Sequence, residues 1–247
     1  MNTRNLAALI TAQGPSVTST DILPGEIEGL QTTLHCVSAG ADLSLAPEPD
    51  IVRACIFLGG EAAAVCGDRE FPVREVALLA PDPRSGLTVR CKDESVSLLE
   101  IRISLIEEDR ETLEQNTGTY PFFTTYSECR TYKEAIKSDK TINRTLLPEY
   151  TFPRLCIGSV QTTGPDEVAR HTHPMLEQLF LGLEGNDCVV TADALDAPFA
   201  ELEILHIPPG SDHGVTVEEG KTLHYIWIDF FRDASGMEYI AETHIDD

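Results

Sequence analysis

Two stretches of the sequence, residues 55–89 and 179–217, follow the same succession of short apolar runs and turn residues. Each runs as strand, glycine turn, strand, acidic turn, strand, proline turn and strand, and the two can be aligned with small gaps. Runs of this length, bounded by Gly, Pro and Asp, are typical of β-strands in a sandwich or barrel. The repeat therefore predicts two copies of one β module in a single chain.

Between the two modules the composition changes from strand-forming to helix-forming residues. Residues 106–118 are acidic helix formers, and residues 127–140 are expected to form a second short helix with Ser127 as its N-cap. A chain of 247 residues is long enough for two small domains with filled cores. We predict an all-β chain with an N-terminal barrel over residues 1–105, a connector with short helices over 106–148 and a C-terminal barrel over 149–247.

The charge of the chain limits the classes of partner. Its 41 acidic and 18 basic residues give a formal net charge of -23 at pH 7, which repels nucleic-acid phosphates and anionic lipid surfaces. The seven scattered cysteines form no CxxC pair and indicate a reducing compartment, and the N-terminus has no clear secretory signal. We expect a cytoplasmic protein without nucleic-acid or membrane partners, which acts on a small molecule and forms a homodimer through apolar sheet faces.

Candidate metal ligands occur in the second module. The segment VARHTHPMLEQLF, residues 168–180, places His171 and His173 one residue apart, and His213 follows a Pro-Pro-Gly turn in LHIPPGSDHGV. Because successive side chains of a strand alternate between its faces, His171 and His173 point to the same side. In the first module Ser85 stands where the shared end of the repeat would place His213. We therefore expect a metal site in the second module alone.

The fourth ligand has two candidates, Glu177 and Gln178. A carboxylate suits a divalent cation better than a neutral amide. If Glu177 faces inward, the three leucines that follow at alternate positions face inward with it, whereas an inward Gln178 would bring Glu184 with it. We therefore favour Glu177 and keep Gln178 as the alternative.

The segments HTHPMLEQLFLGLEG and IPPGSDHGV resemble the paired motifs of the cupin superfamily, and the two modules together resemble a bicupin. In that family an HxH pair, a Glu three or four residues later and a His after a PxG turn hold one metal ion inside a double-stranded β-helix barrel. Two features depart from the family pattern: Gly185 fits the spacing from Gln178 rather than from Glu177, and Val217 replaces a frequent Asn. The resemblance implies two such barrels, the first without metal, and one divalent ion per chain, with Fe, Mn, Ni and Zn all acceptable, on His171, His173, Glu177 and His213.

An ion held by three imidazoles and one carboxylate keeps one or two positions open, which is typical of a reactive site rather than a structural one. We expect a metal-dependent enzyme that acts on a small polar molecule, sugar-like or carboxylate, by Lewis-acid isomerisation or oxygen-dependent cleavage. The alternative is a non-catalytic module that binds a small ligand or a metal. An enzyme needs a proton-transfer group beside the open position, and the candidates are His206, Asp212 and Tyr225.

Several other polar residues have less specific surroundings. Arg154 and Gln161 are weaker candidates for binding a carboxylate or sugar hydroxyls. The remaining histidines are expected to be ordinary surface or core residues: His35, His206, His224 and His244. Because imidazoles must be deprotonated to bind a metal, occupancy is expected to fall as the pH drops through about 6.

Overall fold

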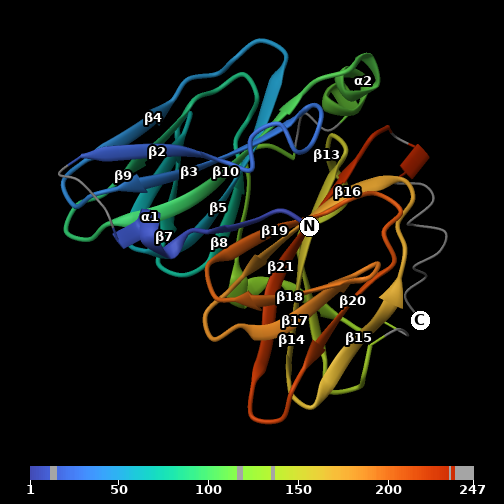
Figure 1. The fold of residues 1–247 in the computed structure, drawn as a ribbon. Helices are drawn as coiled ribbons and strands as arrows, with labels where there is room; N and C mark the ends of the chain where they lie inside the picture. Colours follow the sequence, from blue (N-terminus) through green and yellow to red (C-terminus); the bar gives the residue numbers. More distant parts are fainter. Residues whose placement is uncertain (12–15, 116–118, 135–136, 234, 237–247) are drawn as a thin grey trace. The chain divides into compact units, whose positions relative to one another are not determined.

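A computed structural model describes residues 1–11, 16–115, 119–134, 137–233 and 235–236 (Figure 1). The chain divides into two compact units, Leu6–Cys129 and Met1–Asn5 with Arg130–Asp247. Among these residues the helices are short: α1 (Ala7–Thr11), α2 (Glu107–Gln115) and the 3-10 turn η1 (Tyr126–Glu128). None of the described helices is long and apolar enough to cross a membrane. The prediction of an all-β chain is confirmed.

The unit Leu6–Cys129 consists of two antiparallel sheets, one of six strands in the order β11-β8-β5-β10-β3-β2 and one of four in the order β4-β9-β6-β7. Its strands are β2 (Val17–Ile22), β3 (Leu30–Val37), β4 (Asp42–Leu45), β5 (Ile51–Gly60), β6 (Ala62–Cys66), β7 (Arg69–Val73), β8 (Ala77–Ala80), β9 (Leu87–Arg90), β10 (Val96–Ser104) and β11 (Phe122–Thr125).

The second unit has a seven-stranded sheet in the order β1-β19-β16-β21-β14-β13-β12 and a four-stranded sheet in the order β15-β20-β17-β18. Its strands are β1 (Thr3–Asn5), β12 (Arg130–Tyr132), β13 (Ile142–Phe152), β14 (Leu155–Thr163), β15 (Asp166–His171), β16 (Leu176–Gly182), β17 (Asp187–Ala192), β18 (Leu195–Ala200), β19 (Glu203–Ile207), β20 (His213–Val217) and β21 (Thr222–Phe231).

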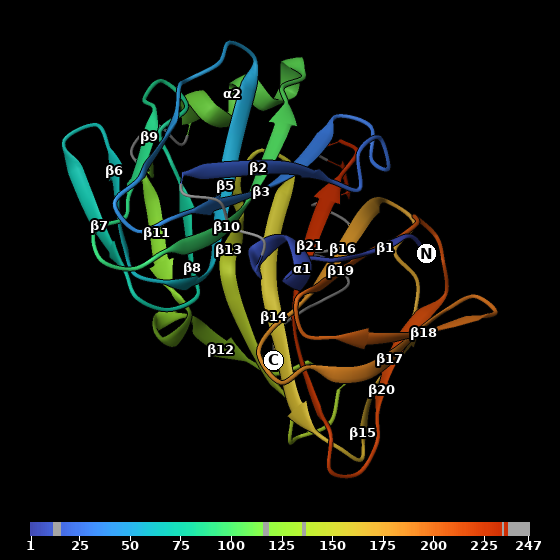
Figure 2. The same cartoon turned by 60° about the vertical axis from the view of Figure 1, so that its left-hand side comes forward.

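The two units repeat the same strand order, which confirms the internal repeat. The series β8-β5-β10-β3-β2 corresponds to β19-β16-β21-β14-β13, and β4-β9-β6-β7 corresponds to β15-β20-β17-β18. One edge strand of each larger sheet comes from an unexpected part of the chain: β11 pairs with β8, and β1, at the N-terminus, pairs with β19 (Figure 2). The sequence predictions did not include this exchange, because strands of three or four residues are too short to show a periodic pattern.

The connector differs from its prediction. Helix α2 is found where the first helix was predicted, but the predicted second helix over residues 127–140 is wrong: this stretch contains η1 and β12, and its residues 135–136 lie outside the described part. Ser127 does not cap a helix, since its Oγ donates to Glu75 at 2.6 Å. Pairing of β12 with β13 outweighs a weak local helix propensity. The predicted connector, 106–148, therefore contributes strands to both units.

The core of the second unit lies between its two sheets and defines which side chains face the barrel interior. The inward residues include Phe180 of β16, Val190 of β17, Leu205 of β19 and Tyr225 of β21. In β17 they alternate with half-exposed residues, in the pattern of a strand with one buried face. Because faces alternate along a strand, Gln178 shares the inward face of Phe180, whereas Glu177 shares the opposite face with Leu179.

Candidate metal centre

Three histidines of the second unit converge on one point. The rings of His171 and His173 have their centroids 4.7 Å apart, and the His213 ring lies 4.5 Å from the first and 5.5 Å from the second. One nitrogen from each ring lies within 4.8 Å of the other two, which is compatible with three ligands of one ion. Among the described residues this is the group of His, Cys, Asp and Glu side chains that could hold a metal.

Backbone pairing and a proline turn bring these histidines together. His171 ends β15 and pairs with His213, the first residue of β20. The turn at residues 208–210 precedes His213, and its Gly210 has a φ of 77°, a conformation that glycine adopts without strain. The amide of Gly210 donates to the carbonyl of His173 at 3.0 Å and links the turn to the HxH segment. The turn thus holds the segment before His213 beside the HxH segment.

In His171 and His213, a hydrogen bond to one ring nitrogen determines which nitrogen is available to bind a metal. His171 Nδ1 lies 2.7 Å from the carbonyl of Ala169, and His213 Nδ1 lies 3.0 Å from the carbonyl of Ser211. A carbonyl accepts only, so Nδ1 of each neutral ring carries the proton and donates it. Nε2 of each ring therefore keeps its lone pair, as an imidazole ligand requires.

His213 provides the clearest indication that a cation fits this site. Its side chain is buried, and its Nε2 has no hydrogen-bond partner among the described residues. Burial lowers the pKa of His213 to about 4 and outweighs the hydrogen bond to Ser211, so the ring is neutral at neutral pH. A buried lone pair without a donor is costly unless something else, such as a metal ion, occupies it.

Glu177 is not part of this cluster, and its expected role as fourth ligand is corrected. Its carboxylate accepts from His206 Nε2 at 2.9 Å and from Arg232 Nη2 at 3.0 Å. These partners lie on the face of the sheet that points away from the core, because His206 pairs with Leu179 across β19 and β16. The parity argument failed because β16 ends at Gly182, so an inward Gln178 does not force Glu184 into the core.

Gln178 faces the interior in the place expected for Glu177. Its Nε2 donates to Asp229 Oδ1 at 2.7 Å, and its Oε1 is buried without a hydrogen-bond donor among the described residues. On the same strand face, Phe180 lies 6.1 Å from the His213 ring, measured between ring centroids. The amide oxygen of Gln178 is thus a neutral candidate for a fourth ligand.

A buried carboxylate, Asp229, accompanies Gln178. It lies on β21 directly across from Gln178 and is 8% exposed. Burial raises the pKa of Asp229 to about 7, although the hydrogen bond from Gln178 and the charge of Lys137 act in the opposite direction. No role was predicted for this residue from the sequence.

Two charged residues near Asp229 were missed by the sequence analysis. Lys137 and Glu134 form an ion pair in which both side chains are largely buried. Burial lowers the pKa of Lys137, although the charges of Glu134 and Asp229 favour its protonated form. They escaped notice because their i,i+3 spacing, in a predicted helix, is typical of a surface ion pair. Polar groups from the connector segment thus lie close to Asp229.

The sequence candidates for proton transfer occupy different surroundings. His206 is engaged with Glu177, as described above, and Asp212 is half-exposed and accepts from Arg170 at 2.8 Å. Neither is part of the histidine cluster. Tyr225 does face the interior, where it packs against Phe180 at 4.6 Å between ring centroids, and burial raises its pKa. Of the three, Tyr225 alone lines the barrel core.

The weaker binding candidates have protein partners. The Arg154 guanidinium lies over the ring of Phe230 at 4.9 Å, and Gln161 accepts from Arg144 at 3.0 Å. His35 lies in the other unit, and His224 Nδ1 donates to the backbone carbonyl of Glu184, outside the cluster. His244 lies outside the described residues.

Replacing Glu177 with Gln is expected to reduce stability without reducing metal content. The change weakens the buried contact with His206, which should lower the free energy of unfolding by about 1–3 kcal/mol. Burial raises the pKa of Glu177, but hydrogen bonds from His206 and Arg232 bring it below its usual value. Its contribution is therefore present above the unfolded-state pKa of about 4.3 and is lost as the pH falls through the lowered folded-state value. Denaturant unfolding at pH 7 and at pH 3, with elemental analysis, measures both effects; a metal-free variant would restore Glu177 as a ligand.

Comparison with solved structures supports the fold. A cupin 2 conserved barrel domain protein from Leptotrichia buccalis matches with a TM-score of 0.66 and 14% identity, over 94% of this chain and 96% of that one. An oxalate decarboxylase from Lactobacillus farciminis, as a formate complex, matches with a TM-score of 0.68 and 10% identity, over 93% and 86%. Vicilin from hazelnut, Corylus avellana, matches with a TM-score of 0.65 and 9% identity, over 93% and 82%.

Comparisons of sequence add no relative. No protein-family model matches the chain, and no curated protein matches it. At identities of 9–14% the structural matches show the fold alone. The fold is thus similar to that of the cupin barrel protein and the oxalate decarboxylase, and the histidine cluster lies in the second unit.

Proposed function

We propose that this chain, a bicupin in its fold, is a metal-dependent enzyme that acts on a small polar organic molecule. The substrate would be a carboxylate or a sugar-like compound, and the metal would be held by His171, His173 and His213 of the second barrel. The amide oxygen of Gln178 is the candidate for a further ligand. A divalent ion bound there would supply Lewis-acid chemistry, or oxygen chemistry if it is iron.

The observation that carries this proposal is the buried, unsatisfied Nε2 of His213 within a cluster of three imidazoles. Neutral imidazoles suit divalent iron, manganese, nickel and zinc. Three imidazoles, alone or together with Gln178, leave one or more positions of a five- or six-coordinate ion open for a substrate.

An enzyme is favoured over a binding module by the polar groups on the inner face. Asp229 and the ion pair of Lys137 with Glu134 place two carboxylates and one ammonium in a largely buried region. Such groups are expensive to bury and are common where protons must be held or moved. In the proposed site Asp229 holds or releases a proton of the substrate, and Gln178 orients its carboxylate through the 2.7 Å hydrogen bond. A module that only binds a ligand needs no such arrangement.

The proposal is tested by turnover before and after metal removal. Purified protein is incubated with small dicarboxylates, hydroxy acids and sugars, beginning with oxalate because a solved relative in fold is an oxalate decarboxylase. Conversion is followed by NMR and oxygen uptake by electrode. We expect turnover that is lost on treatment with a chelator and restored by one metal. Turnover that survives complete metal removal, or ligand binding without conversion in the metal-loaded protein, would contradict the proposal.

The matched control is the His224→Ala variant. His224 belongs to the same unit and is hydrogen-bonded to the carbonyl of Glu184, away from the cluster. Its loss should leave metal-dependent turnover within about twofold of the wild type, as expected for a change away from the site.

A further inference from the structure

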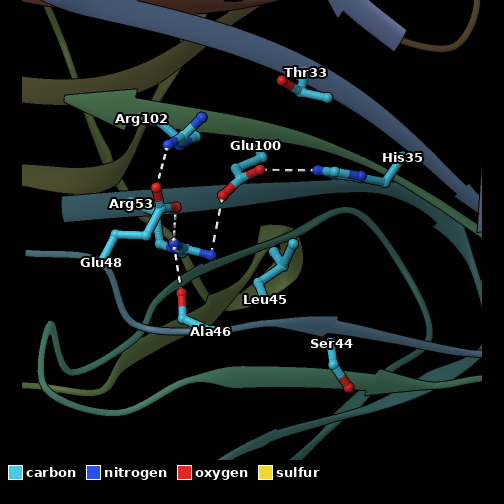
Figure 3. A pocket seen from close by; sticks show the side chains of 9 residues that line it. All are labelled: Thr33, His35, Ser44, Leu45, Ala46, Glu48, Arg53, Glu100 and Arg102. Carbon is cyan, nitrogen blue, oxygen red and sulfur yellow. Dashed lines mark hydrogen bonds and ion pairs between the residues drawn. The ribbon is translucent and has the colours of Figure 1, made fainter. Parts of the chain in front are cut away.

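The first barrel contains a polar cavity. It has a volume of about 330 Å³, at the small end for ligand pockets. It lies within the unit Leu6–Cys129, and its polar lining includes His35, Glu48, Arg53, Glu100 and Arg102 (Figure 3). Among the described residues of this barrel no cluster suited to a metal occurs. The lining offers a ligand charged groups and hydrogen bonds.

The cavity holds a buried carboxylate on the inner face of strand β10. Glu100 is 3% exposed and shares the face of β10 with the core residue Leu98. Its Oε2 accepts from His35 Nε2 at 2.8 Å, and Figure 3 shows Glu100 between His35 and Arg53. Its Oε1 lies 3.3 Å from Arg53 Nη1 as an ion pair, but has no hydrogen-bond donor among the described residues. An acceptor thus faces the cavity.

Arg102 provides an unused donor two residues along the same strand. Its Nη2 donates to Glu48 Oε2 at 2.6 Å, and its Nη1 donates to Gln31 at 3.2 Å. Its Nε is buried and has no acceptor in the described part of the chain. The Nε and Nη2 edge of a guanidinium binds both oxygens of one carboxylate side-on. Here Glu48 accepts from Nη2 alone, so Nε of the same edge is left without an acceptor among the described residues.

The carboxylate of Glu48 lies between the guanidinium groups of Arg53 and Arg102. Glu48 belongs to the exposed Pro47-Glu48-Pro49 segment between β4 and β5, and its side chain is 43% exposed. Its carboxylate bridges Arg53 Nη2 at 2.8 Å and Arg102 Nη2 at 2.6 Å. If Glu48 moves into solvent, two guanidinium groups remain beside one carboxylate, Glu100, and the cavity gains a net positive charge. A bound anion would then restore neutrality.

We propose that this cavity binds a small carboxylic acid that carries a hydroxyl or amino group on a neighbouring carbon. The carboxylate of the ligand displaces Glu48 and takes the Nε and Nη2 edge of Arg102. The hydroxyl or ammonium group donates to Glu100 Oε1. Glu100 and Arg102 are two residues apart on one strand, about 7 Å along it, and one small molecule can bridge that span with a hydrogen bond at each end.

Binding is tested by calorimetry and ligand-observed NMR on the full chain with the His213→Ala change, so that a metal in the second barrel cannot bind the acid. The probes are paired: glycolate and glycine against acetate, and malate against succinate, which lacks the donor. We expect glycolate or glycine, and malate, to bind at least about tenfold more tightly than their donor-free partners. The glycolate and glycine arms distinguish a hydroxy acid from an amino acid.

Three variants separate this proposal from non-specific binding. Arg102→Gln should weaken binding about tenfold or more, and Glu48→Gln should strengthen it about tenfold by removing the internal competitor. Arg84→Gln, which removes an exposed arginine paired with Asp82 in the same unit, should change nothing. The proposal is overturned if none of the donor-bearing acids binds the Glu48→Gln protein at about 50 mM, a generous limit for such small ligands. It is overturned equally if the acids bind but Arg102→Gln, shown by circular dichroism to be folded, binds as the parent does.

Discussion

Replacing Asp229 with Asn is expected to reduce turnover by about 10²–10⁴-fold while the metal content stays unchanged. Asn keeps the size of the side chain, and its Oδ1 can still accept the hydrogen bond from Gln178. The amide of Asn, unlike the carboxyl group of Asp229, cannot take up or release a proton near neutral pH. The loss would therefore appear in kcat rather than in metal affinity, and is measured at saturating substrate with elemental analysis of the same samples.

The control for this prediction is Asp212→Asn. Asp212 was a sequence candidate for proton transfer, but its side chain is half-exposed and paired with Arg170. Exposed ion pairs contribute little, so turnover should change by no more than about twofold. An Asp229→Asn enzyme with more than half of the wild-type kcat would remove Asp229 from the proposed chemistry, and an inactive Asp212→Asn enzyme with its metal still bound would reinstate the sequence candidate.

Replacing His213 with Ala is expected to lower metal affinity by at least about 100-fold, more than the loss of an outer-shell partner. The change deletes the buried nitrogen that has no protein hydrogen-bond partner. It leaves the first barrel unaltered. Titration of the chelator-treated protein with Zn(II) or Mn(II), followed by calorimetry, gives the affinities directly.

His206→Ala and His224→Ala are matched controls for this loss. Both residues belong to the second barrel and neither is in the cluster. Their metal affinities should remain within about threefold of the wild type, in line with mutations away from a site. Equal losses in all three variants would indicate unfolding rather than removal of a ligand, and a His213→Ala protein with wild-type affinity would contradict the assignment.

The sequence predicted the fold and the histidines because both depend on local patterns. Turn residues and alternating apolar runs mark strands wherever the fold places them. The HxH spacing at His171 and His173 fixes a shared strand face, and the turn at residues 208–210 marks the approach of His213. These features do not require knowledge of distant contacts.

The fourth position was mistaken because it depends on where a strand ends. The preference for Glu177 assumed that alternation continues from residue 177 to residue 184, but β16 ends at Gly182. Glu177 is hydrogen-bonded to His206 and Arg232 on the outer face of the sheet. Gln178 is hydrogen-bonded to Asp229 on the inner face. Family spacing from Gly185 pointed to Gln178 and was outweighed by an argument from charge.

The remaining polar residues were missed because they meet only through tertiary structure. Lys137 and Glu134 come from a segment that reads as a helix, and Asp229 lies more than ninety residues away in sequence. In the first barrel, Glu48, Arg53 and Arg102 likewise come from different elements. No short motif could have joined them.

The most direct measurement is elemental analysis of the wild-type protein, purified without chelator and then offered divalent metals. The account predicts about one divalent ion per chain, bound in the second barrel by its three imidazoles. The identity of that ion would also separate oxygen chemistry from Lewis-acid chemistry. A folded wild-type protein that is free of metal and takes up none of the added iron, manganese, nickel or zinc would contradict the account and leave the non-catalytic binding module in its place.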